Sequence, residues 1–228
     1  MSLDKLLVKY LEFCEIEKNL TQSTIKMYHF YLSDFLSFLF DTLHKKQLTE
    51  NDLTEENIRK YRLALNRRIS LKSHEEYKRS TQKTFLIAIR AFLKYLIVEE
   101  SMKVVNPEQI LLGKAEARIP KVLSEDQMTG LFSVQNLGKK SGLRDRALLE
   151  TLFSTGLRVS ELVNLNVDDV NLNTGEFAVI GKGRKVRTVY LSDSARKWLK
   201  QYISTRHDSY KPLFLRYSGK KMPSNDFD

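Results

Sequence analysis

The sequence has little cysteine and little histidine. Cys14 is the only cysteine, so a single chain can form no disulfide and no cysteine-based metal site. This residue lies among apolar side chains at helical spacing, which favours a core position over a reactive thiol. The four histidines are scattered along the chain, and we therefore expect no structural zinc.

Long apolar runs are missing as well. No stretch approaches the roughly 18 apolar residues that a membrane-spanning helix needs. The chain opens with Met1-Ser-Leu-Asp-Lys and passes directly into an amphipathic pattern, so we expect no signal peptide. Together these absences predict a cytoplasmic protein with no membrane partner.

Acidic residues are too few to balance the basic ones. The 228 residues contain 38 Lys and Arg against 28 Asp and Glu, which gives a formal net charge of +10 and a pI of about 9.5. A basic globular protein of this kind favours a polyanionic partner, usually nucleic acid. Hydrophobic residues make up 42% of the chain, enough for one large or two modest domains with real cores.

Residues 1–108 are expected to form a domain of their own. Apolar residues at helical spacing predict four helices: 2–18, one with an apolar face over 25–39, one that starts at Thr54 with a buried face over 58–69, and about 80–98. Residues with capping side chains precede the first three of them: Ser2, Thr21 or Ser23, and Thr54. Four amphipathic helices with short connections predict a small bundle.

Cations gather at the start of the fourth predicted helix. Lys78, Arg79 and Lys83 oppose the helix dipole, so helix stability alone does not explain them. With Ser80 and Thr81 at an exposed helix N-terminus, they suit the oxygens of a phosphate group. A solvated basic face is the alternative interpretation.

Residues 109–123 are expected to form an extended basic linker. Within it, residues 113–121 contain few large apolar side chains and carry Lys114, Arg118 and Lys121. The sequence Ser-Glu-Asp-Gln that follows has the capping-box pattern of a helix start. We therefore expect a second domain over 124–228.

Arg158 lies between two predicted helices. Gly156 suits the left-handed conformation of a helix end, and Leu162 and Leu165 begin a new apolar stripe directly after Arg158. A cation at a helix N-terminus, with apolar neighbours that suggest partial desolvation, is tolerable when an anion lies against it. Glu161 is one turn away, so an Arg–Glu pair that only holds the turn together is the alternative.

A β-hairpin is predicted after residue 175. Residues 176–180 and 186–191 are β-rich, and the intervening Gly-Lys-Gly-Arg-Lys has the composition of a hairpin loop. The glycines leave the backbone bare around Lys182, whose ammonium suits a phosphate either as a point charge or as a proton donor. An ordinary solvated basic turn is the alternative.

The segments STGLRVSELVNLNVDDV and IGKGRKVRTVYLS resemble the tyrosine recombinase (lambda-integrase) family, and most closely its bacterial Xer-like members. Residues 17–28 and 143–149 resemble that family too, so the likeness covers nearly the whole chain. It implies a mainly α fold with a small β-hairpin (α+β), made of an N-terminal four-helix SAM-like core-binding domain and part of a catalytic domain. It also implies that Arg158 is the first catalytic arginine, Lys182 the catalytic lysine and Glu161 a supporting acid.

The resemblance implies site-specific DNA recombination, in which a tyrosine cleaves one strand, forms a 3′-phosphotyrosine link and passes strands through a Holliday junction. It implies no metal and no other cofactor. The implied partners are double-stranded DNA, gripped between the two domains, and further recombinase subunits, a tetramer on two sites. The candidate DNA contacts are Thr24, Lys26, Lys78, Arg79, Ser80, Thr81, Lys83, Lys114, Arg118, Lys121, Arg184 and Lys185.

The sequence departs from the family in the second half of the active site. The family has an H-x-x-R motif, a later His or Trp and the nucleophilic tyrosine, and none of them is found; His207 is followed by Asp-Ser-Tyr. Tyr210 and Tyr217 lie where the family has a strand and a turn. We therefore expect a C-terminally truncated chain that is inactive in cleavage by itself. A non-catalytic DNA-binding accessory or competitor protein at a recombination site is the alternative.

Overall fold

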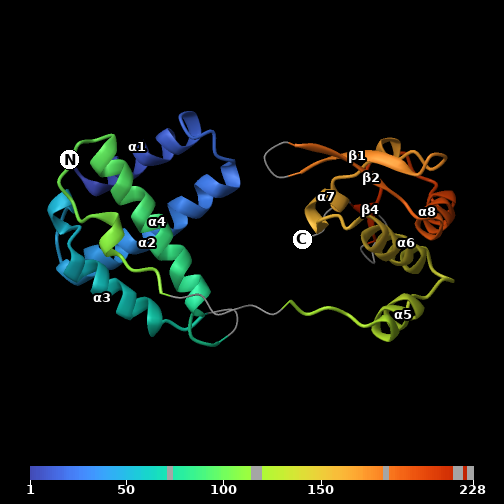
Figure 1. Ribbon diagram of the computed structural model, residues 1–228, viewed down its shortest axis with the longest axis horizontal. Coiled ribbons are helices and arrows are strands. Elements are labelled where there is room, and N and C mark those ends of the chain that lie inside the picture. Colours follow the sequence, from blue (N-terminus) through green and yellow to red (C-terminus); the bar gives the residue numbers. More distant parts are fainter. Residues whose placement is uncertain (71–73, 114–119, 182–184, 218–222, 225–228) are drawn as a thin grey trace. The chain divides into compact units, whose positions relative to one another are not determined.

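The computed structural model describes residues 1–70, 74–113, 120–181, 185–217 and 223–224. The chain divides into two compact units, Met1–Ile119 and Pro120–Asp228, each with its own hydrophobic core. The architecture is mainly helical with short antiparallel strands, as the sequence predicts (Figure 1). Within the described residues, no helix is both long enough and apolar enough to cross a membrane.

The described part of the first unit contains four α-helices. They are α1 (Leu3–Ile16), α2 (Gln22–Leu43), α3 (Glu55–Asn66) and α4 (Arg79–Val98), with single 3-10 turns at Glu50–Asp52 and Pro107–Gln109. The side chains of Ser2, Thr21 and Thr54 accept hydrogen bonds from backbone N–H groups three residues on, which confirms the predicted caps. Lys78 precedes α4 without such a cap.

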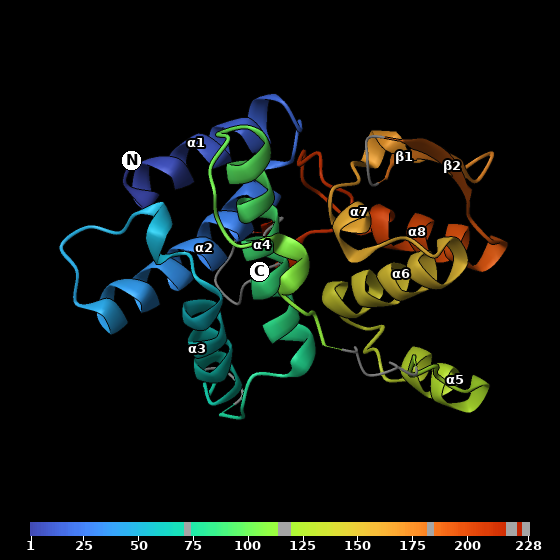
Figure 2. The same cartoon turned by 60° about the vertical axis from the view of Figure 1, so that its left-hand side comes forward.

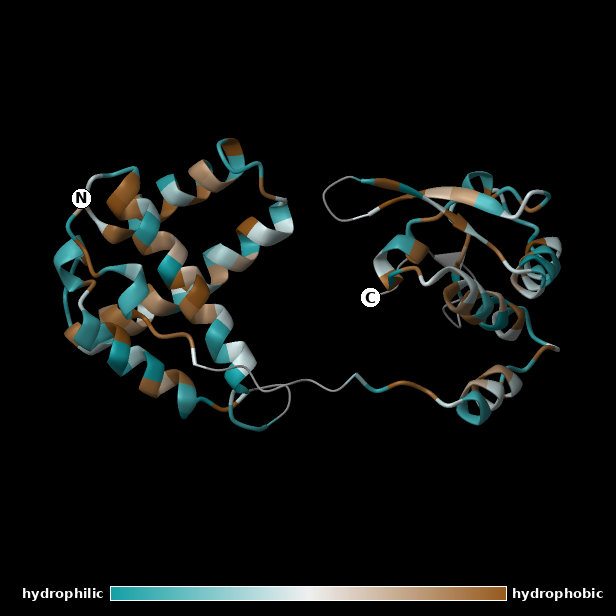
Figure 3. Cartoon of the chain, in the orientation of Figure 1, coloured by the Kyte–Doolittle hydropathy of each residue, from teal (hydrophilic) through white to brown (hydrophobic). Residues whose placement is uncertain are grey.

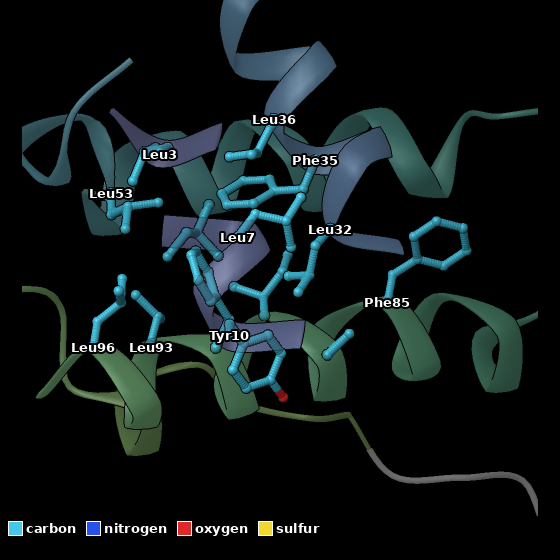
Figure 4. Packing of buried hydrophobic residues seen from close by; sticks show 14 of the residues in the cluster. Leu3, Leu7, Tyr10, Leu32, Phe35, Leu36, Leu53, Phe85, Leu93 and Leu96 are labelled. Carbon is cyan, nitrogen blue, oxygen red and sulfur yellow. The ribbon is translucent and has the colours of Figure 1, made fainter. Parts of the chain in front are cut away.

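Buried leucines and aromatic rings hold the four helices together. Side chains from α1, α2 and α4 point toward one another in this core (Figure 4). Phe35 of α2 is fully buried, and its ring centroid lies 4.9 Å from that of Tyr61 on α3. Cys14 is buried in the same cluster, as its spacing predicts. Hydrophilic residues alternate with these apolar ones along each helix (Figure 3), so the bundle is amphipathic throughout.

One predicted helix is shorter than expected. α3 ends at Asn66, so Ile69 lies beyond the helix. There it forms an isolated β-bridge with Glu76 and is 61% exposed. Its hydrophobicity fits the helical period of the residues before it, but the chain has already turned away from the core.

The second unit combines helices with a β-hairpin. Its elements are α5 (Glu125–Ser133), α6 (Lys140–Thr155), α7 (Val159–Val163), a 3-10 turn (Val167–Asp169), β1 (Glu176–Ile180), β2 (Val186–Tyr190), α8 (Asp193–Ser204), β3 (Arg216–Tyr217) and β4 (Pro223–Ser224). β1 pairs antiparallel with β2, and β3 with β4. α6 and α8 pack along each other (Figure 2). Their inner faces and the hairpin share one buried cluster, which includes Ala147, Val189 and Tyr202.

Candidate active site and nucleic-acid interface

Arg158 lies at the junction of α6 and α7. α6 ends at Thr155 and is capped by Gly156, whose φ of 61° is the left-handed conformation predicted there, and α7 begins directly after Arg158. The guanidinium Nη1 of Arg158 donates to Oε1 of Glu161 at 2.9 Å, and the Arg158 backbone N–H donates to Oε2 at 2.9 Å. The Arg–Glu pair suggested by the sequence is therefore present.

Arg158 is more exposed than the sequence suggests. Its side chain is 64% exposed, so the expected partial desolvation is wrong. Leu157 is indeed buried, but Val159 is 67% exposed and gives Arg158 no apolar cover. Glu161 engages the side chain through Nη1, and the remaining edge of the guanidinium is open to a ligand. A planar fork of this kind matches two oxygens of a phosphate group.

Glu161 is the anion that binds both arginines of the site. Its side chain is only 8% exposed and also accepts two bonds from Arg187 of β2, with Nη1 and Nη2 at 3.0 and 2.8 Å from the two carboxylate oxygens. The hydrogen bonds from Arg187, followed by that from the Arg158 backbone, lower the pKa of Glu161 to about 2. The carboxylate therefore stays ionised at neutral pH.

Arg187 is absent from the sequence-based candidates, although the sequence carries a signal for it. On β2 it shares a face with the buried Val189, whereas Val186, Thr188 and Tyr190 face the other side and are exposed. A cation on the inward face of a strand is stable there only with an anionic partner. That pattern predicts an anionic partner for Arg187. It does not identify the partner as Glu161, because Glu161 lies 26 residues away in the chain.

The hairpin loop is described only at its two ends. The Gly181 N–H donates to the carbonyl oxygen of Lys185 at 2.8 Å, and Lys185 is exposed. Lys182 and Arg184 lie outside the described residues. A Cβ on Gly181 would come within 2.9 Å of Nη1 of Arg187, so this position favours glycine. The residue before Lys182 in the sequence thus packs on the Arg187–Glu161 pair.

The cations at the start of α4 border a groove against α3. Lys78, Arg79, Ser80 and Thr81 are exposed, and Lys83 is half-buried. Arg79 and Lys83 line a groove of about 700 Å³ together with two arginines of α3 that the sequence analysis did not single out: Arg59 and Arg62. The groove also contains Lys60, which pairs with Glu56 at 2.8 Å, so an excess of positive charge remains. We name this surface the α3–α4 groove.

The other candidate contacts are separate from this groove. Thr24 and Lys26 lie in the first turns of α2 and are not part of the described groove lining. The Thr24 hydroxyl lies 3.0 Å from that of Thr21 and so belongs to the helix cap, whereas Lys26 is exposed. In the second unit, Lys121 is exposed. Lys114 and Arg118 lie outside the described residues.

Of the two late tyrosines, only Tyr217 lies in a strand, and Tyr210 lies in the loop that precedes it. The strand is β3, and Tyr210 is 44% exposed. Among the described residues, no cluster of three His, Cys, Asp or Glu side chains is arranged to hold a metal ion.

Comparison with protein families gives two matches along the chain. Residues 7–100 match the phage integrase N-terminal SAM-like domain, and residues 121–228 match the phage integrase family. The chain is 34% identical to tyrosine recombinase XerC of Leptospira interrogans, over 97% of this chain and 70% of that protein. It is 33% identical to tyrosine recombinase XerD of Pasteurella multocida, over 82% of this chain and 60% of that protein.

Solved structures share the fold at low identity. A lambda integrase dimer bound to a COC′ core site matches with a TM-score of 0.70 and 15% identity, over 98% of this chain and 59% of the integrase. The Tn1549 transposon integrase in complex with transposon right end DNA matches with a TM-score of 0.66 and 16% identity, over 98% and 73% of the two chains. At such identities the likeness concerns the fold.

Proposed function

Since this chain belongs to the phage integrase family of tyrosine recombinases, we propose that it binds double-stranded DNA and activates a phosphate for site-specific strand cleavage and rejoining. The observation that carries the proposal is the contrast within one ion pair: Glu161 is nearly buried, and the Arg158 guanidinium that it holds is open to solvent. The protein acts on DNA in the cytoplasm. In the complete reaction it is one subunit of a recombinase tetramer that holds two DNA sites.

Arg158 and Lys182 have different tasks in the proposed reaction. The family's tyrosine attacks phosphorus, the bond to the 5′-oxygen breaks, and the pentacoordinate phosphate in between carries extra negative charge on its non-bridging oxygens. The Arg158 guanidinium stabilises that charge. Lys182 gives a proton to the leaving 5′-oxygen. Glu161 orients Arg158 without touching DNA.

The α3–α4 groove supplies phosphate contacts in the first unit. Its arginines and lysines form a positively charged surface beside the uncapped N-terminus of α4. Contacts of this type fix the position of a protein on DNA without reading its sequence. In the second unit, Lys121 and Lys185 are exposed cations with the same proposed role.

DNA binding by this chain should depend steeply on salt. If about six phosphates are neutralised, the slope of log affinity against log salt concentration is about −5, because each phosphate contact releases counterions. Arg62→Ala should reduce that slope by about 1. Lys200→Ala, which removes an exposed cation of α8, should leave it unchanged. Fluorescence anisotropy over a salt series measures all three slopes. Affinity that does not respond to salt contradicts the proposal.

The 228-residue polypeptide should form no covalent link to DNA. It contains no H-x-x-R motif, and its late tyrosines lie in or near β3. A nicked suicide substrate traps a phosphotyrosine adduct, which a denaturing gel displays as a shifted band. We expect no such band. An adduct at Tyr210 or Tyr217 would show that the nucleophile has been misassigned.

A DNA-binding accessory or competitor protein at a recombination site is the second candidate, favoured by the positive charge of the α3–α4 groove, which can bind phosphates without any catalytic step. The reading frame after codon 228 separates the two functions. An in-frame H-x-x-R and a tyrosine within the next helices support the recombinase. A stop codon there supports the accessory protein.

A further inference from the structure

Arg187 has no role in the reaction proposed above, yet it binds the carboxylate that orients Arg158. We propose that Arg187 is a positioning residue: through Glu161 it ties the base of the β1–β2 hairpin to Arg158. The inference rests on the proposed function, which assigns Arg158 and Lys182 of the hairpin to one phosphate.

The contact between Arg187 and Glu161 is bidentate. Two parallel N–H···O bonds of 3.0 and 2.8 Å fix the distance between the groups and the plane of the guanidinium. The carboxylate is nearly buried, so water competes little for it. α7, which carries Glu161, and β2, which carries Arg187, are therefore joined by a directional bond and not by apolar packing alone.

The same pair supports the base of the loop. Arg187 lies opposite Val179 in the β1–β2 register, and the ladder ends at the next pair, Ile180 and Val186. Gly181 follows directly, and its α-carbon lies so close to Nη1 of Arg187 that a Cβ would clash at 2.9 Å. A shift of the Arg187 guanidinium therefore changes the surface on which the start of the loop lies.

The two oxygens of Glu161 are shared between Arg187 and Arg158. Oε1 accepts from both guanidinium groups, and Oε2 accepts from Arg187 and from the Arg158 backbone N–H. Loss of Arg187 leaves both Arg158 bonds in place but releases the hairpin base. The defect should therefore fall on the hairpin and not on Arg158.

Hydrogen exchange of the chain itself tests the structural part. Arg187→Met keeps the aliphatic stem and removes the charge, and Arg187→Lys keeps the charge without the fork. In both variants the Gly181 amide should exchange about tenfold or more faster, while the amides of α6 and α8 keep their protection. Thr188→Ala, on the opposite and exposed face of β2, is the matched control and should change nothing. Unchanged exchange at Gly181 in Arg187→Met overturns the inference.

Cleavage kinetics test the functional part, in a recombinase that joins these residues to the family's H-x-x-R motif and tyrosine. Arg187→Met should slow cleavage by up to about 10²-fold, and a sulfur in place of the 5′-bridging oxygen should largely restore the rate, since that leaving group needs no proton. Equal slowing on both substrates overturns the inference. Failure of the unmodified chain to bind DNA would instead overturn the proposed function, whatever the exchange data show.

Discussion

Arg158→Ala should slow strand cleavage by about 10²–10³-fold, and a sulfur leaving group should not restore the rate. The expected loss equals that of one preorganised donor to a developing oxyanion, because Arg158 stabilises charge on the non-bridging oxygens. Lys182→Ala should also be slow on normal DNA but should recover on DNA with a 5′-bridging sulfur. The measurement is the single-turnover cleavage rate of a recombinase that carries these residues and the nucleophilic tyrosine.

The comparison between the two variants is internally controlled. Both remove one cation, so a general loss of DNA affinity would slow both substrates in both variants. Lys200→Ala is a further control, because it removes one exposed positive charge of α8, away from the hairpin. If the sulfur substrate restored the cleavage rate of Arg158→Ala and Lys182→Ala equally, or restored neither, the roles assigned to the two residues would be wrong. Lys182 would then be a phosphate anchor only.

Phe35→Ala should destabilise the first unit by about 3–5 kcal/mol. The side chain is fully buried in the core, where its ring packs against Tyr61 of α3, and its removal adds the cost of a cavity to the lost transfer free energy. A domain of this size has a free energy of unfolding of about 5–15 kcal/mol, so the loss is a large share of it. Native-state hydrogen exchange, read on peptides of α1–α4, measures the change in this unit alone.

Phe40→Ala on the same helix is the matched control. Phe40 is 49% exposed and is not among the described residues that pack against the buried cluster, so the free energy of unfolding should change by no more than about 0.5 kcal/mol. The second unit has a separate core, and its amides should exchange as in the unmodified chain. If both variants lowered the free energy of unfolding by a similar amount, the assignment of Phe35 to the core and of Phe40 to the surface would be contradicted.

Much of the fold could be predicted because helix ends follow local rules. A side-chain oxygen at Ser2, Thr21 or Thr54 reaches only the N–H groups of the next turn, so a few residues of sequence determine the result. The same holds for the left-handed Gly156 and for the strands on either side of the hairpin loop. Even the Arg158–Glu161 pair spans a single turn.

The remainder depends on contacts between elements. The bond from Arg187 to Glu161 joins β2 to α7, and Arg62 meets Arg79 only because α3 and α4 pack together. The exposure of Arg158 was mispredicted for a related reason. The sequence shows that both neighbours of Arg158 are apolar, but it does not show which of them is buried. In the fold, Leu157 faces the core and Val159 faces solvent.

The way α5 is held in the second unit gives the chain an optical reporter. The Arg146 guanidinium lies over two rings, 4.7 Å from the centroid of Phe132 at the end of α5 and 4.8 Å from that of Trp198 on α8, and it also donates to the Phe132 carbonyl oxygen. Trp198 is the only tryptophan in the sequence. Arg146 belongs to α6, which packs on α8, and it is also bound by Glu150 at 2.8 Å. Detachment of α5 would therefore remove Phe132 from the other face of this cation and open the group to water, so the emission of the nearby indole should report the docking of α5. No dye or added label is needed to observe it.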